Sequence, residues 1–259
     1  MRRKSALITG ATSGIGAAFA RYWAACGYNL IITGRRAHAL NGLAETISAA
    51  SGAGVEVFVG DLADAGDREA LVELITARDD LEVLINNAGF GSSTRYPGGD
   101  LQVFREMVAV HIQAAVELVY AVVPQMTERG SGTIINVSSL AAFAPLPSSA
   151  IYCGTKAFLV LFSESLAAKL KHGGIRVQAL CPGLTKTDFH RKIGMADAQR
   201  KNHAFVRWME ADDVVRLSIR CLRSHNVICV PGFWNKVTRM VVSLVPRRLY
   251  YRVVTRALK

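Results

Sequence analysis

Short apolar runs alternate with longer amphipathic stretches along most of the chain. Seven runs are nearly continuous in Leu, Ile and Val, which is the pattern of strands covered on both faces. These runs are Ala6–Gly10, Asn29–Gly34, Val55–Asp61, Glu82–Gly89, Gly132–Ser139, Arg176–Gly183 and Asn226–Gly232. The helices predicted between them include Gly14–Cys26, Ala63–Arg78, Asp100–Thr127 and Ile151–His172. The alternation predicts an α/β fold with a doubly wound, seven-stranded parallel sheet and helices on both faces.

The chain is expected to form one domain. Its 259 residues are 51% hydrophobic and 20% charged, which excludes a disordered chain and suits one large core. We find no repeat at solenoid spacing, no linker and no low-complexity tract. We therefore assign 1–233 to the main domain and 234–259 to a basic, amphipathic, helical extension of that domain.

Charge is distributed unevenly along the chain. The 31 Lys and Arg against 20 Asp and Glu give a net charge of +11, yet residues 1–185 hold 15 of each sign. From Val214 to Lys259 there are ten basic residues and no acidic one. This bias calls for an anionic substrate, an acidic partner or a membrane surface.

The C-terminal extension also carries an apolar stripe. Its members at helical spacing are Val237, Met240, Val241 and Leu244, followed beyond Pro246 by Leu249, Val253, Val254 and Leu258. Such a stripe either packs within the protein or on a second subunit, or it lies on an anionic membrane. We favour packing and keep peripheral membrane contact as the alternative.

The cysteines indicate a reducing compartment. There are five, Cys26, Cys153, Cys181, Cys221 and Cys229, without any C-x-x-C, so neither a disulfide framework nor a metal site is predicted. The N-terminal apolar run ends at Gly10, too early for a signal peptide, and no run reaches the length of a spanning helix. We expect a cytoplasmic protein, with attachment to a membrane surface left open and no nucleic-acid partner.

A glycine-rich turn follows the first predicted strand. It reads Thr9-Gly10-Ala11-Thr12-Ser13-Gly14-Ile15-Gly16 and leads directly into a helix. Glycines at such a turn let the backbone approach a pyrophosphate, whose charge is stabilised at the helix N-terminus. The motif is weak by itself, because many glycine-rich turns after strands bind nothing.

Three further motifs follow later strands. Tyr152 and Lys156 share one helix face at i and i+4, and Ser139 precedes Tyr152 by thirteen residues. Asn86-Asn87-Ala88-Gly89 follows the fourth run, and Pro182-Gly183-Leu184-Thr185-Lys186-Thr187 follows the sixth. Together with the glycine-rich turn, these motifs resemble the short-chain dehydrogenase/reductase family, with its Rossmann fold, over roughly residues 5–232.

The resemblance implies a catalytic set. Tyr152 would be the acid/base, with its pKa lowered from about 10 by the Lys156 cation and the nicotinamide charge. Ser139 would bind the substrate oxygen, whereas Ser138 lies at the wrong spacing. Lys156 would also bind the nicotinamide ribose. The implied cofactor contacts are Gly10, Thr12, Ser13, Gly14, Ile15, Gly16, Arg35, Asp61, Leu62, Asn87, Ala88, Gly89, Tyr152, Lys156, Pro182, Gly183, Thr185 and Thr187.

His111 departs from the family pattern. Many members have an Asn at this place in the long helix, where it bends the helix and holds a water of the proton relay. Two interpretations are open. His111 is a buried histidine satisfied by a backbone carbonyl, or its imidazole replaces the amide and makes activity sensitive near pH 6 to 7.

The end of the second strand indicates the cofactor. NAD-specific members of the family tend to have an acidic residue where this chain has Gly34, and Arg35 and Arg36 follow. An arginine suits a 2′-phosphate, so we predict NADP(H), bound through Arg35; the alternative is that both arginines are merely solvated. Asp61-Leu62 resembles the family's adenine-contacting pair, although Asp61 could instead cap the next helix.

Apolar residues predominate in the segments expected to line the substrate pocket. They are Phe90, Leu140, Phe143, Leu146, Phe189, Phe205, Trp208 and Met209, some of which are equally suited to the core. We predict a small lipophilic carbonyl or alcohol substrate, namely a ketone, aldehyde, steroid or 3-oxoacyl compound. A cationic rim of Lys186, Arg191 and Lys192 could favour an anionic or thioester substrate.

The predicted function is that of an NADP(H)-dependent short-chain carbonyl reductase or alcohol dehydrogenase. The rival is a catalytically weak NADP(H)-binding protein that acts through its basic tail on a membrane or a partner. The intact Ser139, Tyr152 and Lys156 favour the enzyme, whereas His111 is the one motif position against it. The long apolar helices at Asp100–Thr127 and Ile151–His172 resemble those that build homodimers and homotetramers in this family.

Overall fold

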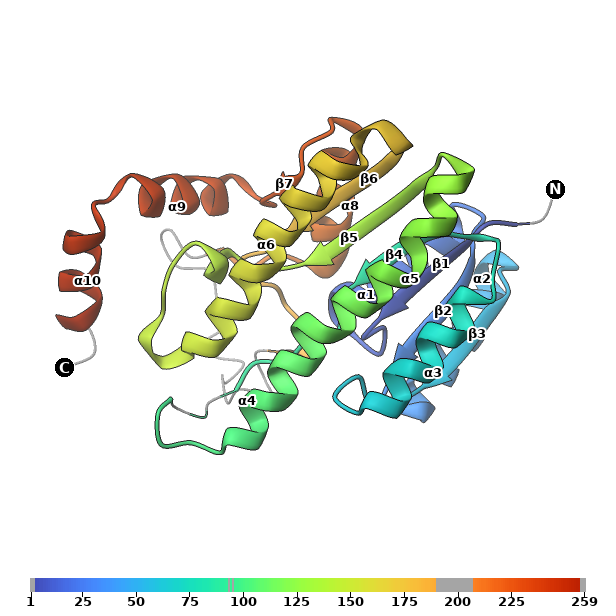
Figure 1. Ribbon diagram of the computed structural model, residues 1–259, viewed down its shortest axis with the longest axis horizontal. Coiled ribbons are helices and arrows are strands. Elements are labelled where there is room, and N and C mark those ends of the chain that lie inside the picture. The colour runs from blue at the N-terminus through green and yellow to red at the C-terminus, as the bar shows by residue number, and fades with distance from the viewer. Residues whose placement is uncertain (1–2, 93, 95, 190–206, 257–259) are drawn as a thin grey trace.

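The computed structural model describes residues 3–92, 94, 96–189 and 207–256, with side chains up to 252. Its centre is a seven-stranded parallel sheet in the order β3-β2-β1-β4-β5-β6-β7 (Figure 1). The strands are β1 (Ser5–Thr9), β2 (Asn29–Gly34), β3 (Val55–Val59), β4 (Leu81–Asn86), β5 (Gly132–Val137), β6 (Ile175–Leu180) and β7 (Ile228–Cys229). The predicted doubly wound sheet is therefore confirmed, with each strand from the third to the seventh shorter than the predicted run.

Helices cover both faces of the sheet. One face carries α1 (Gly14–Ala25), α2 (Ala37–Ser51) and α8 (Ala211–Arg223); the other carries α3 (Ala65–Thr76), α5 (Ala114–Arg129) and α6 (Ala150–Leu170). Helices α2 and α8 were not among those named from the sequence. Because the strands contribute buried side chains to two separate apolar clusters, the sheet separates two cores.

The predicted long helix Asp100–Thr127 is confirmed as one helical stretch, Leu101–Arg129, which has an irregular turn in its middle. It consists of α4 (Leu101–Val108), a π-helical turn η1 (Ala109–Gln113) and α5. The Ala114 N–H bonds to the Ala109 carbonyl, one residue farther back than in an α-helix. This wider turn contains His111, whose buried ring is bonded on both sides, and these tertiary bonds are the physical reason for the irregularity.

Two helical stretches, Leu101–Arg129 and Pro147–Gly173, are long and apolar enough to cross a membrane by length and composition alone. This corrects the expectation that no such run exists. Side chains of α5 and α6 pack in the core beneath the sheet, which explains much of their hydropathy. Their outer surface is apolar as well, since Val116, Tyr120, Phe158 and Leu161 are exposed.

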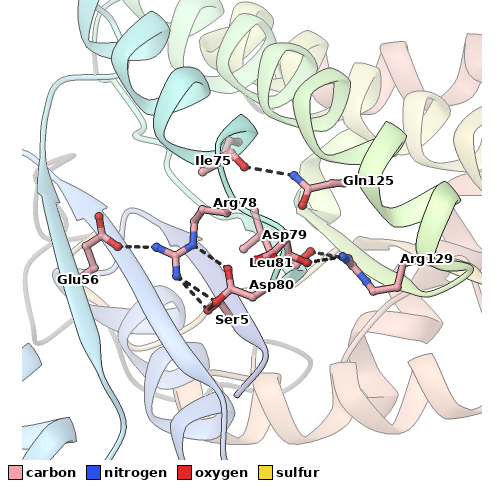
Figure 2. Close-up of polar contacts among 9 residues, drawn as sticks. All are labelled: Ser5, Glu56, Ile75, Arg78, Asp79, Asp80, Leu81, Gln125 and Arg129. Atoms are coloured by element: carbon pink, nitrogen blue, oxygen red, sulfur yellow. Dashed lines mark hydrogen bonds and ion pairs between the residues drawn. The ribbon is translucent and has the colours of Figure 1, made fainter. Parts of the chain in front are cut away.

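A polar network closes the amino-terminal edge of the sheet. Figure 2 shows the Arg78 guanidinium between Asp80 and Glu56, with nitrogen–oxygen distances of 2.9 Å to Asp80 and 2.7 Å to Glu56. The Arg129 guanidinium donates to the carbonyls of Asp79 and Leu81 at 2.9 and 2.7 Å. Burial opposes ionisation of Asp80, but its bonds from Arg78 and Ser5 prevail and lower the pKa of the carboxyl. These pairs tie α3 and α5 to the ends of β1 and β4.

The C-terminal extension forms two helices, α9 (Phe233–Leu244) and α10 (Arg247–Arg256). Figure 1 shows them beyond the sheet, on the opposite side of the molecule from the N-terminus. Met240, Val241 and Leu244 of the predicted stripe are exposed, so packing of these three against their own chain is wrong. The physical reason is that α9 turns its other face toward the body, through Asn235 and Arg239.

Candidate active site

A cavity of about 490 Å³ lies at the carboxyl ends of the strands. Segments that follow β1 to β6 line it, among them the glycine-rich turn, Arg35, Asn87, Ser139 and Pro182. In parallel sheets of this order, ligands bind at this edge, where the chain leaves β1 and β4 in opposite directions. The described residues thus bring five separate sequence motifs to one site.

The glycine-rich turn is shaped to accept an anion. Gly10 and Gly14 have φ of 64° and 58°, and a Cβ on Gly14 would come within 2.7 Å of Thr187. The N-cap of α1, Ser13, makes no side-chain capping bond, and no acidic residue occupies the first turn. The first N–H groups of α1 can therefore bind an oxyanion from the cavity, so the turn fits the pyrophosphate of a dinucleotide.

Buried polar bonds fix this turn to the neighbouring strand. The buried Thr9 hydroxyl accepts from the N–H groups of Asn87 and Ala88, both at 2.9 Å. The Asn87 side chain donates back to the carbonyls of Thr9 and Gly10 at 2.9 and 3.1 Å. Thr9 was missed from the sequence, and its position directly before the turn was the available signal.

Ser139, Tyr152 and Lys156 all line the cavity. The Ser139 hydroxyl accepts from the Ala141 N–H at 3.1 Å, which leaves its own proton for Tyr152 or for a substrate oxygen. The Lys156 Nζ lies 5.8 Å from the centre of the Tyr152 ring and donates to the Val137 carbonyl at 3.0 Å. The neighbouring Ser138 instead donates to the Lys156 carbonyl at 2.7 Å, where it holds α6 in place.

Burial governs the titration of this set. It raises the pKa of Tyr152 to about 12, and the hydrogen bond from Ser139 only partly opposes it. It lowers the pKa of Lys156 to about 8. Loss of water thus sets the direction of the Tyr152 pKa in the protein itself. At neutral pH the phenol therefore holds its proton, which is the form that can donate to a substrate oxygen. The lowering of this pKa by Lys156 together with the nicotinamide charge stays a prediction for the complex with the cofactor.

His111 is a buried, fully bonded histidine. Its Nε2 accepts from the Phe90 N–H at 3.0 Å, and its Nδ1 lies 2.9 Å from the Thr155 hydroxyl. Because that hydroxyl donates to the Tyr152 carbonyl, the Nδ1 must carry the proton. Burial, followed by the Lys156 charge, holds the pKa of His111 well below its usual range. The geometry supports the buried-histidine interpretation, with an N–H in place of the expected carbonyl.

The two arginines after β2 both line the cavity. Arg35 pairs with Asp61 at 3.2 Å, whereas Arg36 donates to the Thr12 hydroxyl at 2.8 Å and lies next to Ser13. Arg36 was not assigned a role from the sequence, although it follows Arg35 directly. The alternative role of Asp61 as a helix cap is wrong, because Asp64 caps α3 through the Asp67 N–H.

Only some of the predicted substrate residues line the cavity. Phe90 and Phe189 line the cavity, together with Val103 and Val110, which the sequence analysis missed. Leu140, Phe143, Leu146 and Trp208 are not among its described lining residues. Leu140 and Phe143 pack against a small apolar cluster around β6, Leu146 is partly exposed, and Trp208 is buried elsewhere.

Lys186 is paired with Glu210 at 2.6 Å, and Met209 packs on the core. Arg191, Lys192 and Phe205 lie outside the described residues.

Most implied cofactor residues also line the cavity. They are Gly10, Thr12, Ser13, Gly14, Ile15, Arg35, Asp61, Leu62, Asn87, Ala88, Gly89, Tyr152, Lys156, Pro182, Gly183, Thr185 and Thr187. Gly16 is not among the described lining residues; a Cβ there would meet the Gly10 carbonyl at 2.4 Å. Gly16 is therefore needed for close packing of α1 on the turn. Within the same described part of the chain, no group of three potential ligands is placed to hold a metal ion.

Comparison with known proteins gives consistent matches. The profile of the family described as short chain dehydrogenase matches residues 4–198. Sulfoacetaldehyde reductase 2 of Chromohalobacter salexigens is 37% identical over 82% of this chain and 85% of its own length. An uncharacterized oxidoreductase of Myxococcus xanthus is 36% identical over 96% of each chain. A short-chain dehydrogenase from Sphingobium yanoikuyae in complex with NADPH superposes with a TM-score of 0.83 at 28% identity, covering 94% of this chain and 96% of that one.

Proposed function

The chain belongs to the short-chain dehydrogenase/reductase family of oxidoreductases, and from this premise we propose that it transfers hydride between NADP(H) and a lipophilic carbonyl or alcohol. The observation that carries the proposal is the convergence of Ser139, Tyr152 and Lys156 on one cavity with the glycine-rich turn. When bound there, the nicotinamide cofactor supplies or accepts the hydride.

The residues of the chain supply the proton and the orientation. Tyr152 donates its phenolic proton to the carbonyl oxygen as that oxygen gains negative charge. Ser139 donates a hydrogen bond to the same oxygen, which is possible because its acceptor side is already used by Ala141. Lys156 provides a positive charge beneath the Tyr152 ring and is held there by Val137. His111 bonds to the Phe90 N–H on one side and, through the Thr155 hydroxyl, to the Tyr152 carbonyl on the other. It thereby fixes the position of Tyr152 relative to Phe90 in the cavity lining.

Two arginines at the end of β2 support the proposal of NADP(H) over NAD(H). Both Arg35 and Arg36 border the cavity, and Gly34 offers no carboxylate for a ribose diol. Paired titrations with NADPH and NADH test this for Arg35→Gln and Arg36→Gln, with Arg216→Gln as an exposed control. We expect about 10- to 100-fold weaker NADPH binding for at least one of the first two, with NADH unaffected. Equal losses for both cofactors would reject the assignment.

The proposed substrate is lipophilic because Phe90, Val103, Val110 and Phe189 provide the apolar wall of the cavity. A screen of NADPH oxidation against aliphatic aldehydes, ketosteroids and 3-oxoacyl thioesters tests the class. Small polar sugars and hydroxy acids are the matched negative set. Preference for that set over the apolar compounds would reject the substrate proposal and leave the hydride-transfer proposal in place.

The second candidate is a catalytically weak NADP(H)-binding protein. It is favoured by the Tyr152 phenol, whose pKa of about 12 opposes formation of the phenolate needed for alcohol oxidation. Cofactor binding without turnover of any screened substrate in either direction would favour this candidate. We also propose a homodimer or homotetramer, because the outer surfaces of α5 and α6 expose Val116, Tyr120, Phe158 and Leu161. We propose a cytoplasmic location on the ground that all five cysteines are free.

A further inference from the structure

Helix α9 presents its apolar side to solvent. Phe233, Met240, Val241 and Leu244 are between 48% and 74% exposed. At about 3.6 residues per turn these four fall on one side of the helix. A helix on the surface of a soluble protein normally turns such a stripe inward. Helix α10 continues the surface, with Leu249 and Tyr251 about half exposed.

The opposite side of α9 is anchored to the body. The buried Asn235 amide donates to the Pro231 carbonyl at 2.7 Å and lies against Gly183, where a Cβ would come within 2.4 Å of its oxygen. The Arg239 guanidinium lies 4.6 Å from the centre of the Phe143 ring. In α10, the Tyr250 hydroxyl donates to the Pro145 carbonyl at 2.9 Å. These bonds fix which side of the tail faces outward.

The charge of this tail selects an anionic partner. Residues 233–259 contain seven basic residues and no acidic one, and Lys236, Arg247, Arg248 and Arg252 are exposed. Pairing two tails face to face would bring fourteen positive charges together, which opposes a symmetric contact.

We propose that the outward side of α9 and α10 is a docking surface for an anionic lipid bilayer. The apolar side chains enter the boundary between head groups and acyl chains, and the arginines contact the lipid phosphates. The inward side of the same two helices touches the body at Phe143, Pro145 and Gly183, which belong to the loops after β5 and β6, and segments of these loops border the cavity. Docking therefore places the catalytic edge of the sheet near the membrane, where a lipophilic substrate of the proposed function is concentrated.

Vesicle co-sedimentation of the full chain tests the docking surface without depending on activity. Vesicles of phosphatidylcholine alone are compared with vesicles that also contain phosphatidylglycerol. We expect binding only to the anionic vesicles, with a decline as salt is raised. Leu244→Glu is compared with Thr238→Glu, an exposed position on another side of the same helix that changes the net charge equally. The first should weaken binding at least tenfold more than the second, because only it replaces an inserted apolar side chain.

The basic part is tested by a second matched pair. Arg247→Gln with Arg248→Gln removes two exposed charges from α10, and Lys169→Gln with Lys171→Gln removes two exposed charges at the end of α6. The first pair should lose roughly 25-fold in binding, at about fivefold for each charge, and the second should lose little. Circular dichroism and cofactor binding verify that each variant is folded.

Three results would overturn the proposal. One is equal binding of the wild type to neutral and anionic vesicles, or no binding to either. Another is equal loss from Leu244→Glu and Thr238→Glu, which would mean that charge alone attracts the protein. The third is a smaller oligomer for Leu244→Glu with unchanged vesicle binding, which would assign this side of α9 to a second copy of the chain. None of these results depends on the substrate screen, so the proposed function stands or fails separately.

Discussion

The two edges of the sheet hold their ionisable groups in opposite electrostatic situations. At the amino edge, Arg78 is paired with both Asp80 and Glu56, and the pKa of Asp80 is lowered (Figure 2). At the carboxyl edge, burial dominates, raising the pKa of Tyr152 to about 12 and lowering that of Lys156 to about 8. The first edge favours the charged forms of its groups, whereas the second favours their neutral forms.

The difference shows what each edge contributes. The charges at the amino edge are paired with one another within the chain, so their contribution is to tie its segments together. Buried groups without a countercharge reduce stability, but they respond strongly to any ligand that brings charge into the cavity. A substitution at the carboxyl edge should therefore change turnover, whereas a substitution at the amino edge should change only the free energy of unfolding.

Tyr152→Phe should produce the largest effect, and it should fall on activity alone. The ring remains and only the exchangeable proton is lost, so we expect turnover to fall by about 10²–10⁴-fold. Steady-state rates with any accepted substrate, together with NADPH titration and thermal melting, measure it. Near wild-type turnover would show that Tyr152 takes no part in the reaction. The carboxyl edge would then have no demonstrated role in activity that the amino edge lacks.

Asp80→Asn should come second, with an effect on stability alone. It removes the charge that Arg78 and Ser5 bind while keeping the shape, so the free energy of unfolding should fall by about 1–3 kcal/mol. Since the pKa of Asp80 is lowered from 3.8, its contribution is present above that pH and is lost as the pH falls through the lower value in the folded protein. Denaturant melts at several pH values measure the difference from the wild type. A loss of turnover at unchanged stability would contradict the assignment of the amino edge to stability and of the carboxyl edge to activity.

Lys156→Met should have the opposite sign in stability while lowering activity. The pKa of Lys156 falls from 10.5 to about 8 on folding, so at pH 7 the folded protein holds its proton at a cost. Without that cost, and with the bond to Val137 lost, the variant should be more stable by about 1–2 kcal/mol. The gain should be full below pH 8 and disappear between about 8 and 10.5. A variant less stable than the wild type at pH 7 would show that Lys156 is better compensated than its surroundings indicate.

Gln125→Leu should give the smallest change. Gln125 donates to the Ile75 carbonyl at 3.2 Å, but its own buried oxygen has no hydrogen-bond partner among the described residues. The substitution removes one hydrogen bond, which lowers stability, and one unsatisfied buried oxygen, which raises it. The free energy of unfolding should therefore change by no more than about 0.5 kcal/mol. The same melts as for Asp80→Asn provide the comparison. A large loss here would mean that the amino-edge network acts as one unit rather than through its Arg78 pairs.

The fold and the centre of the site could be predicted because they depend on local sequence. Continuous apolar runs predicted the parallel strands, and each motif follows a strand whose carboxyl end points to the same edge. The turn after β1 and the Tyr152–Lys156 pair are short-range patterns of this kind. Their meeting in one cavity follows from the strand order.

The remaining features depend on tertiary contacts that no local pattern contains. The π-helical turn exists because His111 bonds to Phe90 and Thr155, which lie far from it in sequence. The high pKa of Tyr152 comes from burial by several elements. The roles of the consecutive Arg35 and Arg36 depend on where the backbone turns after β2, and Phe143 lies outside the cavity lining because it packs near α9.

Helices α9 and α10 give the molecule an electric dipole with a basic end. They hold six basic residues and no acidic one, and they lie on the opposite side of the molecule from the N-terminus. An external field exerts a torque on such a molecule, so a negatively charged surface turns the basic end toward itself before any contact forms. At physiological salt this alignment acts over a Debye length of about 8 Å, and it raises the fraction of collisions that arrive in one orientation. Dilution of salt should therefore accelerate association with a negative surface more than it slows dissociation.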